Sequence, residues 1–206
     1  MLCEAMVSRG DLSELPAERV FQEMAKALAL DHPEIFFSFL KGISADKHLW
    51  PELNDPAIDL LAKTTKDTSS VQRFAILFCH SPVDKIKFRC QQLKTPRQYQ
   101  ALAVNCSQHM SIWNQVSSLS PEEIVGFFYD LDAIRQPDRF QEFNATCGQI
   151  AQARASTGHE PGSWINCLSI ISNITSADVD GSLKGPAIGE AIRRLQIEAI
   201  ESHHED

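Results

Sequence analysis

The feature that most constrains this 206-residue sequence is the spacing of its apolar residues, which recur every three or four positions along nearly the whole chain. That period is typical of amphipathic helices, whereas a half-buried strand alternates apolar and polar residues, and no convincing alternation is present. Proline follows a polar residue at the head of several periodic segments, as at Ser120-Pro121 and Gln136-Pro137, which is a helix-start signal. The sequence therefore predicts an all-α fold of roughly ten helices without a sheet.

The expected helices can be placed from these signals. They cover 16–30, 33–40, 56–66, 70–80, about 164–171, and segments that begin near 82, 96, 121, 137 and 186. Residues 159–162 are expected to form a loop, and a weak boundary there would separate a body, 1–156, from a C-terminal piece, 157–206.

The helical period also predicts which side chains point inward. The expected inward residues are Ile35, Phe36, Phe39 and Leu40 in one short helix, Tyr99, Leu102, Cys106, Met110 and Trp113 in a longer one, and Ile188, Ile192, Leu195 and Ala199 in the last.

Composition limits the classes of protein to consider. Hydrophobic residues make up 43% of the chain and charged residues 22%, which is typical of a soluble globular protein, and no apolar run approaches the ~20 residues of a membrane span. Six cysteines without paired spacing are expected to be reduced, as in a cytoplasmic protein. The net charge of −8 excludes a protein that is coated with positive charge, although a local basic face is still compatible with it.

We find no arrangement of residues with the spacing that catalysis or metal binding requires. Cys106 and His109 lie three residues apart, but no second ligand pair completes a zinc site. Cys79 and His80 are adjacent on an expected helix and point ~100° apart, so they cannot act as nucleophile and base. No glycine-rich phosphate loop is present either. We therefore predict no catalytic residue, no metal site and no cofactor in this chain.

Two basic clusters remain as candidate phosphate-binding surfaces. Their members are Lys85, Lys87, Arg89, Lys94 and Arg97 in the first cluster, and Lys184, Arg193 and Arg194 in the second. The second cluster surrounds the start of the last expected helix, where free backbone N–H groups favour an anion. For either cluster, a charged helix face exposed to water is the alternative to a phosphate contact.

Three segments stand out together. Residues 18–23 read Glu-Arg-Val-Phe-Gln-Glu, residues 131–140 read Leu-Asp-Ala-Ile-Arg-Gln-Pro-Asp-Arg-Phe, and residues 183–192 read Leu-Lys-Gly-Pro-Ala-Ile-Gly-Glu-Ala-Ile. In this order and spacing they resemble the E-R-[VI]-W-x-E neck motif, the L-D-A-x-R-x-P-[ED]-R-F segment and the L-x-G-P-x-I-G tail signature of bacterial CCA-adding tRNA nucleotidyltransferases, in the poly(A) polymerase superfamily. Phe21 replaces the usual tryptophan of the neck motif.

This resemblance implies the neck, body and tail of such an enzyme, with 1–156 as neck and body and 157–206 as tail. The family's catalytic head, which adds C, C and A to tRNA from CTP and ATP with magnesium, precedes the neck motif, and only seventeen residues precede Glu18 here. We therefore expect a truncated product, a proteolytic remnant or a headless paralogue. By itself it is expected to add no nucleotide, to bind tRNA but not DNA, and not to bind a membrane. A bacterial poly(A) polymerase fragment and a headless helical interaction module are the alternatives.

Some members of the family carry a metal-dependent phosphohydrolase insert, which residues 74–81 resemble. Its His-Asp pair is His80-Ser81 here, and a neutral hydroxyl cannot replace a metal-bridging carboxylate. We therefore expect no phosphohydrolase activity.

The resemblance also suggests roles for individual residues. Lys184 and the N–H groups of Ala187, Ile188 and Gly189 would meet a phosphate of tRNA, and Arg193 and Arg194 would line the same surface. Gly185 and Gly189 would permit close approach of the RNA or, alternatively, tight helix–helix packing. In the neck, we expect Arg19 and Glu23 to form an ion pair one helical turn apart. Arg135 and Arg139 either pair with Asp132 or Asp138 or contact RNA.

Overall fold

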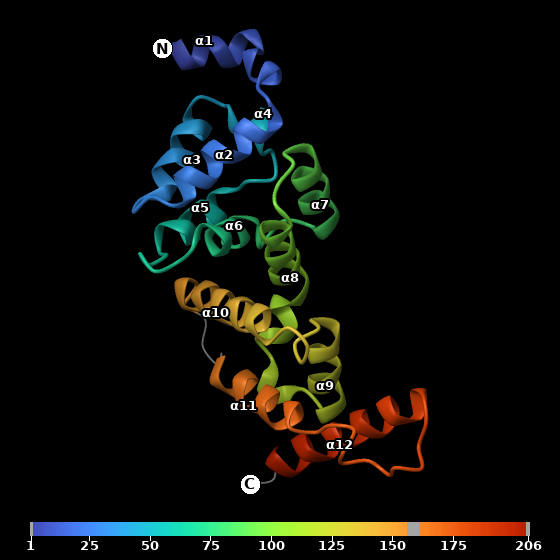
Figure 1. Cartoon of the computed structure of the whole chain (residues 1–206). Helices are drawn as coiled ribbons and strands as arrows, with labels where there is room; N and C mark the ends of the chain where they lie inside the picture. Colours follow the sequence, from blue (N-terminus) through green and yellow to red (C-terminus); the bar gives the residue numbers. More distant parts are fainter. Residues whose placement is uncertain (1, 156–160, 205–206) are drawn as a thin grey trace. The chain divides into compact units, whose positions relative to one another are not determined.

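The computed structural model describes residues 2–155 and 161–204, and these residues contain twelve α-helices, two short 3₁₀ segments and no strand. The predicted all-α class is confirmed. Figure 1 shows the elements in order along the chain: α1 (Leu2–Arg9), η1 (Asp11–Glu14), α2 (Ala17–Leu28), α3 (Pro33–Gly42), α4 (Asp46–Leu49), α5 (Asp55–Ala62), α6 (Ser70–Phe78), α7 (Val83–Gln92), α8 (Arg97–Trp113), η2 (Val116–Ser118), α9 (Pro121–Asp130), α10 (Pro137–Ala153), α11 (Pro161–Ser172) and α12 (Pro186–His204).

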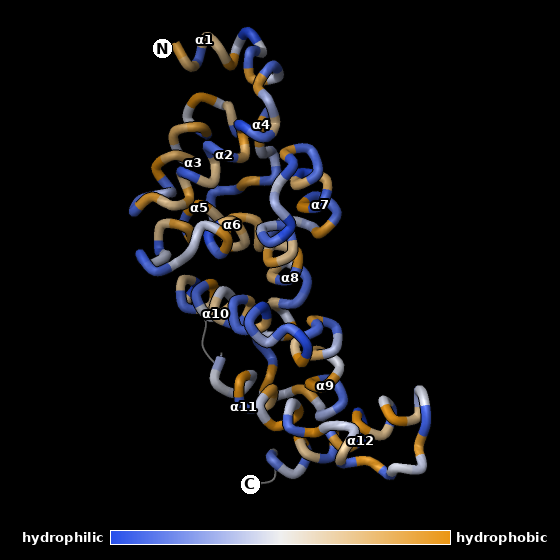
Figure 2. Tube along the Cα trace, viewed as in Figure 1, coloured by the Kyte–Doolittle hydropathy of each residue, from blue (hydrophilic) through white to orange (hydrophobic). Residues whose placement is uncertain are grey.

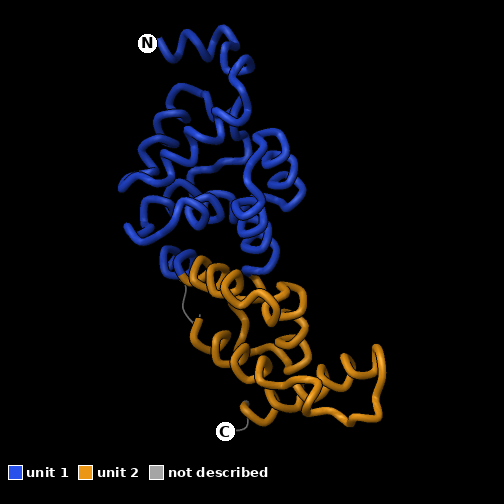
Figure 3. Tube along the Cα trace, viewed as in Figure 1, with its two compact units in different colours: residues 1–110, 149–156 blue, residues 111–148, 157–206 orange. Residues whose placement is uncertain are grey.

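The chain forms two compact units, which Figure 3 distinguishes by colour. Unit 1 comprises 1–110 and 149–156, and unit 2 comprises 111–148 and 157–206, so that α8 and α10 each contribute to both units. The boundary predicted at 156/157 lies outside the described residues and stays a prediction.

Unit 1 is built around α6, against which α2 and α5 pack. Phe74 of α6 lies edge-to-face with Phe21 of α2, at 6.4 Å between ring centroids, and with Tyr99 of α8, at 5.6 Å. Arg73 is almost completely buried beside them, and its guanidinium donates to the backbone carbonyls of Leu28, Leu30 and Thr65. The carbonyl of Leu28, the last residue of α2, thereby finds a donor that its own helix does not supply.

Unit 2 has an aromatic core between α9, α10 and α11. The ring of Trp164 packs against Phe127 and Phe128 at centroid distances of 4.3 and 5.5 Å. Its indole N–H donates to the backbone carbonyl of Trp113, while the N–H of Trp113 donates to Asn144 Oδ1 at 2.7 Å. The indole nitrogens of Trp113 and Trp164 are therefore both hydrogen-bonded, as is usual for buried polar groups.

Helix starts follow the local sequence closely. Proline is the first residue of α3, α9, α10 and α12, as predicted, because its fixed φ suits the first turn and its missing N–H would be unpaired there anyway. At α9 a capping box joins Ser120 and Glu123. The loop expected at 159–162 is wrong for Pro161 and Gly162, which begin α11, again with proline first; 159–160 lie outside the described residues.

The inward stripes are confirmed for α8, where Tyr99, Leu102, Cys106, Met110 and Trp113 are all buried. In α12 the buried residues are instead Ala191, Gln196 and Ile200, whereas Ile188, Ile192, Leu195 and Ala199 are only half-buried.

The stripe predicted for α3 is wrong for Ile35 and Phe39, whereas Phe36 and Leu40 are half-buried. Ile35 and Phe39 are 62% and 44% exposed, and Phe37 is the buried ring, packed edge-to-face on Trp50 at 6.0 Å. Apolar residues occupy most positions around this helix, so its period does not single out one face.

Polar and apolar residues are interspersed along the helices, as Figure 2 shows. Within 2–155 and 161–204, no helix combines the length and the apolar character that crossing a bilayer demands. The six cysteines form no disulfide: Cys90, Cys106, Cys147 and Cys167 are buried, Cys79 is half-buried and Cys3 is exposed.

Candidate nucleic-acid interface

The cations of the first basic cluster lie in unit 1 and divide into paired and free ones. Arg89 is held by Glu52, with Nε donating to Oε2 at 3.1 Å and Nη2 donating to Oε1 at 3.0 Å, and both side chains are largely buried. Nothing local in the sequence signals this partner, because Glu52 lies 37 residues earlier. Lys85 and Lys87 on the same helix are exposed and form no ion pair with any described residue.

The C-terminal end of this cluster is also paired in part. Lys94, in the left-handed region at φ 50° just after α7, contacts the carboxylate of Glu18 in the neck motif. This hydrogen bond holds the pKa of Glu18 below its usual value. Arg97, the first residue of α8, is exposed and forms no ion pair within the described part of the chain.

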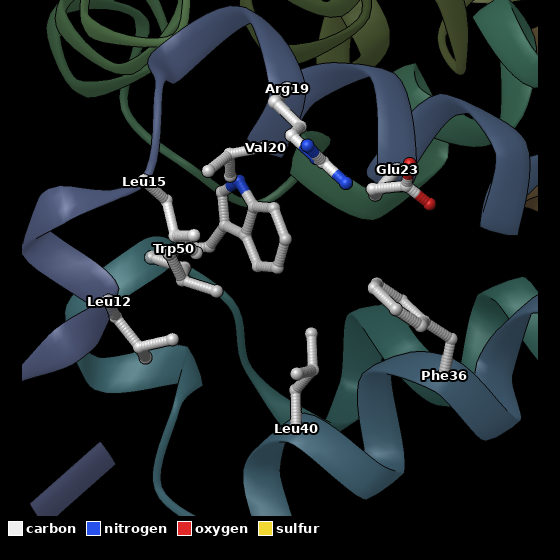
Figure 4. A pocket seen from close by; sticks show the side chains of 9 residues that line it. Leu12, Leu15, Arg19, Val20, Glu23, Phe36, Leu40 and Trp50 are labelled. Carbon is white, nitrogen blue, oxygen red and sulfur yellow. The ribbon is translucent and has the colours of Figure 1, made fainter. Parts of the chain in front are cut away.

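The expected ion pair between Arg19 and Glu23 is not formed, because Glu23 pairs with Lys26, one turn along α2, at 2.9 Å. Arg19 and Glu23 instead line a pocket of about 230 Å³ whose remaining walls are apolar. Figure 4 shows the two charged side chains coming from α2, with Trp50 on one side of the pocket and Phe36 across from it.

His80 lies beside the guanidinium of Arg154, whose Nη2 is 3.0 Å from the imidazole Nε2 and 3.5 Å from Cys79 Sγ. Burial is the main cause that lowers the pKa of His80, and the positive charge of Arg154 lowers it further. Burial raises the pKa of the Cys79 thiol to about 11, so the group is protonated at neutral pH and is a poor nucleophile or metal ligand. The cation of Arg154 thus lies against both side chains, and the described residues contain no cluster of three metal-ligating side chains.

The second basic cluster lies in unit 2, around the start of α12. Gly185 has φ +59°, a left-handed conformation that favours glycine, and lets the chain turn into Pro186. The N–H of Ile188 donates to the Gly185 carbonyl at 3.2 Å, so it is already paired. A Cβ at Gly185 or Gly189 would meet nothing within 4 Å, which rules out tight helix–helix packing among the described residues as the reason for either glycine.

Lys184, Arg193 and Arg194 are all exposed, and none forms an ion pair with a described residue. The guanidinium of Arg193 instead lies over the ring of Tyr129 in α9, at 5.2 Å from the ring centroid. Sequence reasoning missed Tyr129, because it follows Phe127 and Phe128 in an apolar run and resembles another core residue.

The second motif segment, residues 131–140, is held by a local pair. Arg135 Nε donates to Asp132 Oδ1 at 2.6 Å, and the carboxylate also accepts from Gln136 Nε2 at 2.6 Å. These donors lower the pKa of Asp132. The ion-pair alternative is therefore confirmed for Arg135. Arg139 is exposed and shows no ion pair within the described ranges.

Comparison with known proteins finds similarity along nearly the whole chain. It is 28% identical over 207 residues to the CCA-adding enzyme of Pseudomonas putida (strain W619), covering 98% of this chain and 56% of that protein. It is 28% identical over 242 residues to the Multifunctional CCA protein of Nitrosococcus oceani, covering 97% and 60% respectively. With the CCA-adding enzyme of Coxiella burnetii (strain RSA 331) it shares 29% identity over 206 residues, covering 97% and 53%.

The chain thus spans a little over half the length of the curated relatives it matches. No family model matches it, and no solved structure does. The resemblance predicted from residues 18–23, 131–140 and 183–192 is confirmed by these relatives.

Proposed function

Because this chain is a homologue of the CCA-adding enzymes, we propose that it is the tRNA-binding helical portion of such an enzyme. It acts in the maturation and repair of tRNA 3′ ends by positioning the acceptor stem and elbow for a nucleotidyltransferase head. The names of the relatives favour this function over that of a poly(A) polymerase fragment.

The observation that carries the proposal is the group of free cations in unit 2. Lys184, Arg193 and Arg194 are exposed and without a carboxylate partner in the described part of the chain, although the protein has 27 acidic residues and a net charge of −8. Some other cations are neutralised by acidic groups, as at Lys94–Glu18 and Arg135–Asp132. Cations left free in an acidic protein are suited to bind the phosphates of a partner.

The physical chemistry of RNA fits a helical scaffold of this kind. A-form RNA hides its base edges in a deep and narrow major groove, so proteins recognise its duplexes through phosphates and 2′-hydroxyls. A few well-placed lysines and arginines are sufficient for such contacts. Lys85 and Lys87 of α7 offer a second set of free cations in unit 1.

The catalytic parts of the reaction belong, in this proposal, to the head. CTP, ATP and magnesium bind there, and this chain alone holds no cofactor and incorporates no nucleotide. We place the protein in the cytoplasm, where tRNA is processed. Incubation of the pure chain with tRNA lacking its CCA end, labelled CTP and magnesium tests the catalytic part of the proposal, and any incorporation of label would contradict it.

Titration with tRNA at several salt concentrations tests the binding itself. Each phosphate contact on duplex RNA contributes ~0.9 to the slope of log K against log salt, by analogy with B-form DNA. We expect Lys184→Ala combined with Arg194→Ala to weaken binding and to reduce the slope by ~1.8.

The matched control removes two cations that the structure shows to be paired, Lys94→Ala with Arg135→Ala. It changes the net charge by the same amount but should leave the slope nearly unchanged. Equal effects of the two double variants would contradict the assignment of these residues. A wild-type slope of zero would instead favour the headless interaction module.

A further inference from the structure

Within unit 2, Arg193 and Tyr129 form a stack that the proposed phosphate contacts do not explain. Arg193 Cζ lies 5.2 Å from the centroid of the Tyr129 ring, and that ring is 44% exposed. Glu190 is one turn earlier on α12, a suitable distance for an ion pair, yet the described structure shows none between them. The guanidinium lies over the aromatic ring rather than beside the nearby carboxylate.

The ring is held in place by a chain of hydrogen bonds into the core. Tyr129 Oη donates to Gln196 Oε1 at 3.0 Å, and Gln196 Nε2 donates to the backbone carbonyl of Ile171 at 3.1 Å. Gln196 is only 1% exposed, so its side-chain amide, which accepts from Tyr129, is held in place in the core. Because its orientation is fixed before any ligand arrives, the ring loses little conformational entropy on binding.

The backbone of α9 adds a second constraint at Gly126. A Cβ built on Gly126 would lie 3.6 Å from Arg193 Nη2, which shows that the guanidinium passes close over this helix. Arg193 is therefore supported by the ring of Tyr129 and by the backbone beneath it. The planar guanidinium of Arg193 therefore lies at the surface, and no described residue supplies a carboxylate to its N–H donors.

We propose that the Arg193–Tyr129 stack binds an unpaired base of the RNA, a site that rests on the proposed function and deepens it. Unpaired bases stack on aromatic rings and on arginine planes, whereas bases inside a duplex are not accessible to either. The base lies against the exposed part of the stack, and the guanidinium N–H groups reach its edge or the adjoining phosphate. The ligand class is thus a loop or single-stranded end of a folded RNA.

Substitutions can separate stacking from charge at this site. Arg193→Lys keeps the positive charge and removes the plane, and Tyr129→Leu removes the ring. Arg194→Lys is the matched control, because Arg194 is exposed on the same helix and makes no ring contact in the described structure. Tyr129→Phe retains the ring and removes only the hydroxyl that Gln196 accepts from.

The readout is the affinity of the full chain for tRNA and for a fully paired RNA duplex, measured by fluorescence anisotropy at several salt concentrations. Arg193→Lys and Tyr129→Leu should each weaken tRNA binding about tenfold, which is typical for the loss of one stacked base. Duplex affinity and the salt slope should stay unchanged, and Arg194→Lys should alter neither affinity. Tyr129→Phe should fall between Tyr129→Leu and the wild type.

Three other outcomes overturn the inference in distinguishable ways. If the wild type binds tRNA and Arg193→Lys binds it equally well, no base stacks there, and the proposed function stands. If Arg193→Lys weakens tRNA and duplex alike, Arg193 contacts only the backbone. If the wild type binds neither RNA, both the stacking site and the proposed function are wrong.

Discussion

At the scale of single residues, the buried guanidinium of Arg73 has the clearest structural role. It is 2% exposed and donates at 2.8, 2.6 and 2.8 Å to the carbonyls of Leu28, Leu30 and Thr65, and burial lowers its pKa. Because Arg73→Met would leave the carbonyls of Leu28 and Leu30 without a donor among the described residues, we expect the free energy of unfolding to fall by about 3 kcal/mol. Urea denaturation measures this loss. Arg139→Met, at an exposed position, serves as the control and should change the midpoint little.

The thiol of Cys79 gives a prediction about pH. Burial raises its pKa to about 11, against an ordinary value of 9.0, so at pH 8 only ~0.1% of the group is thiolate. Alkylation of Cys79 by iodoacetamide should therefore accelerate about tenfold per pH unit between pH 8 and 10. Peptide mass spectrometry follows the reaction, with the exposed Cys3 as an internal reference that reacts at pH 8. Rapid modification of Cys79 at pH 8 would show that burial does not protect it.

The same shift predicts the direction of a stability change. The native pKa of Cys79 lies above the unfolded value, so the unfolded chain ionises first as the pH rises. The contribution of this group to stability is complete below about pH 9 and is lost between there and about pH 11. Cys79→Ser should flatten this part of the pH dependence of the urea midpoint, whereas Cys3→Ser, at an exposed position, should leave it unchanged.

At the scale of helices, local chemistry was sufficient for most of the fold. Proline positions predicted the starts of α3, α9, α10 and α12, and a clear stripe predicted the buried face of α8. These features depend on residues within one or two turns of each other. The short helices α1 and α4 were not expected, since neither carries a long periodic stripe.

The buried face of α3 was not predictable, because its apolar residues surround most of the helix and its buried ring, Phe37, packs on Trp50, which is distant in the sequence. Phe37→Ala should lower the free energy of unfolding by about 3–5 kcal/mol, as in other buried phenylalanines. Phe39→Ala removes the same atoms from the same helix at a 44% exposed position and should cost well under half as much. Equal losses in urea denaturation would show that Phe39 is buried too.

The candidate site follows the same division between local and distant information. The sequence was sufficient to select Lys184, Arg193 and Arg194 as a cluster, because their charges are visible in the chain itself. It could not show that Arg89 is paired with Glu52, or that Arg193 lies over Tyr129, because both partners are distant in the sequence, one in the turn before α5 and one in α9. Which cations are free is therefore a property of the folded structure.

At the scale of the whole molecule, net charge and local charge act in opposite directions. With a net charge of −8, the protein as a whole repels any polyanion, and only its free cations attract phosphates. A few cations attract a ligand only where its phosphates and 2′-hydroxyls match the positions of those cations. Such a surface favours one folded RNA shape over an arbitrary duplex. If the chain binds tRNA as proposed, an excess of double-stranded DNA, matched in phosphate concentration, should displace little tRNA at ~150 mM salt. Competition in an anisotropy assay measures this, and lowering the salt tenfold should admit some DNA binding as screening weakens. If DNA competes as well as unlabelled tRNA at both salt concentrations, the surface responds to charge alone and does not recognise RNA shape.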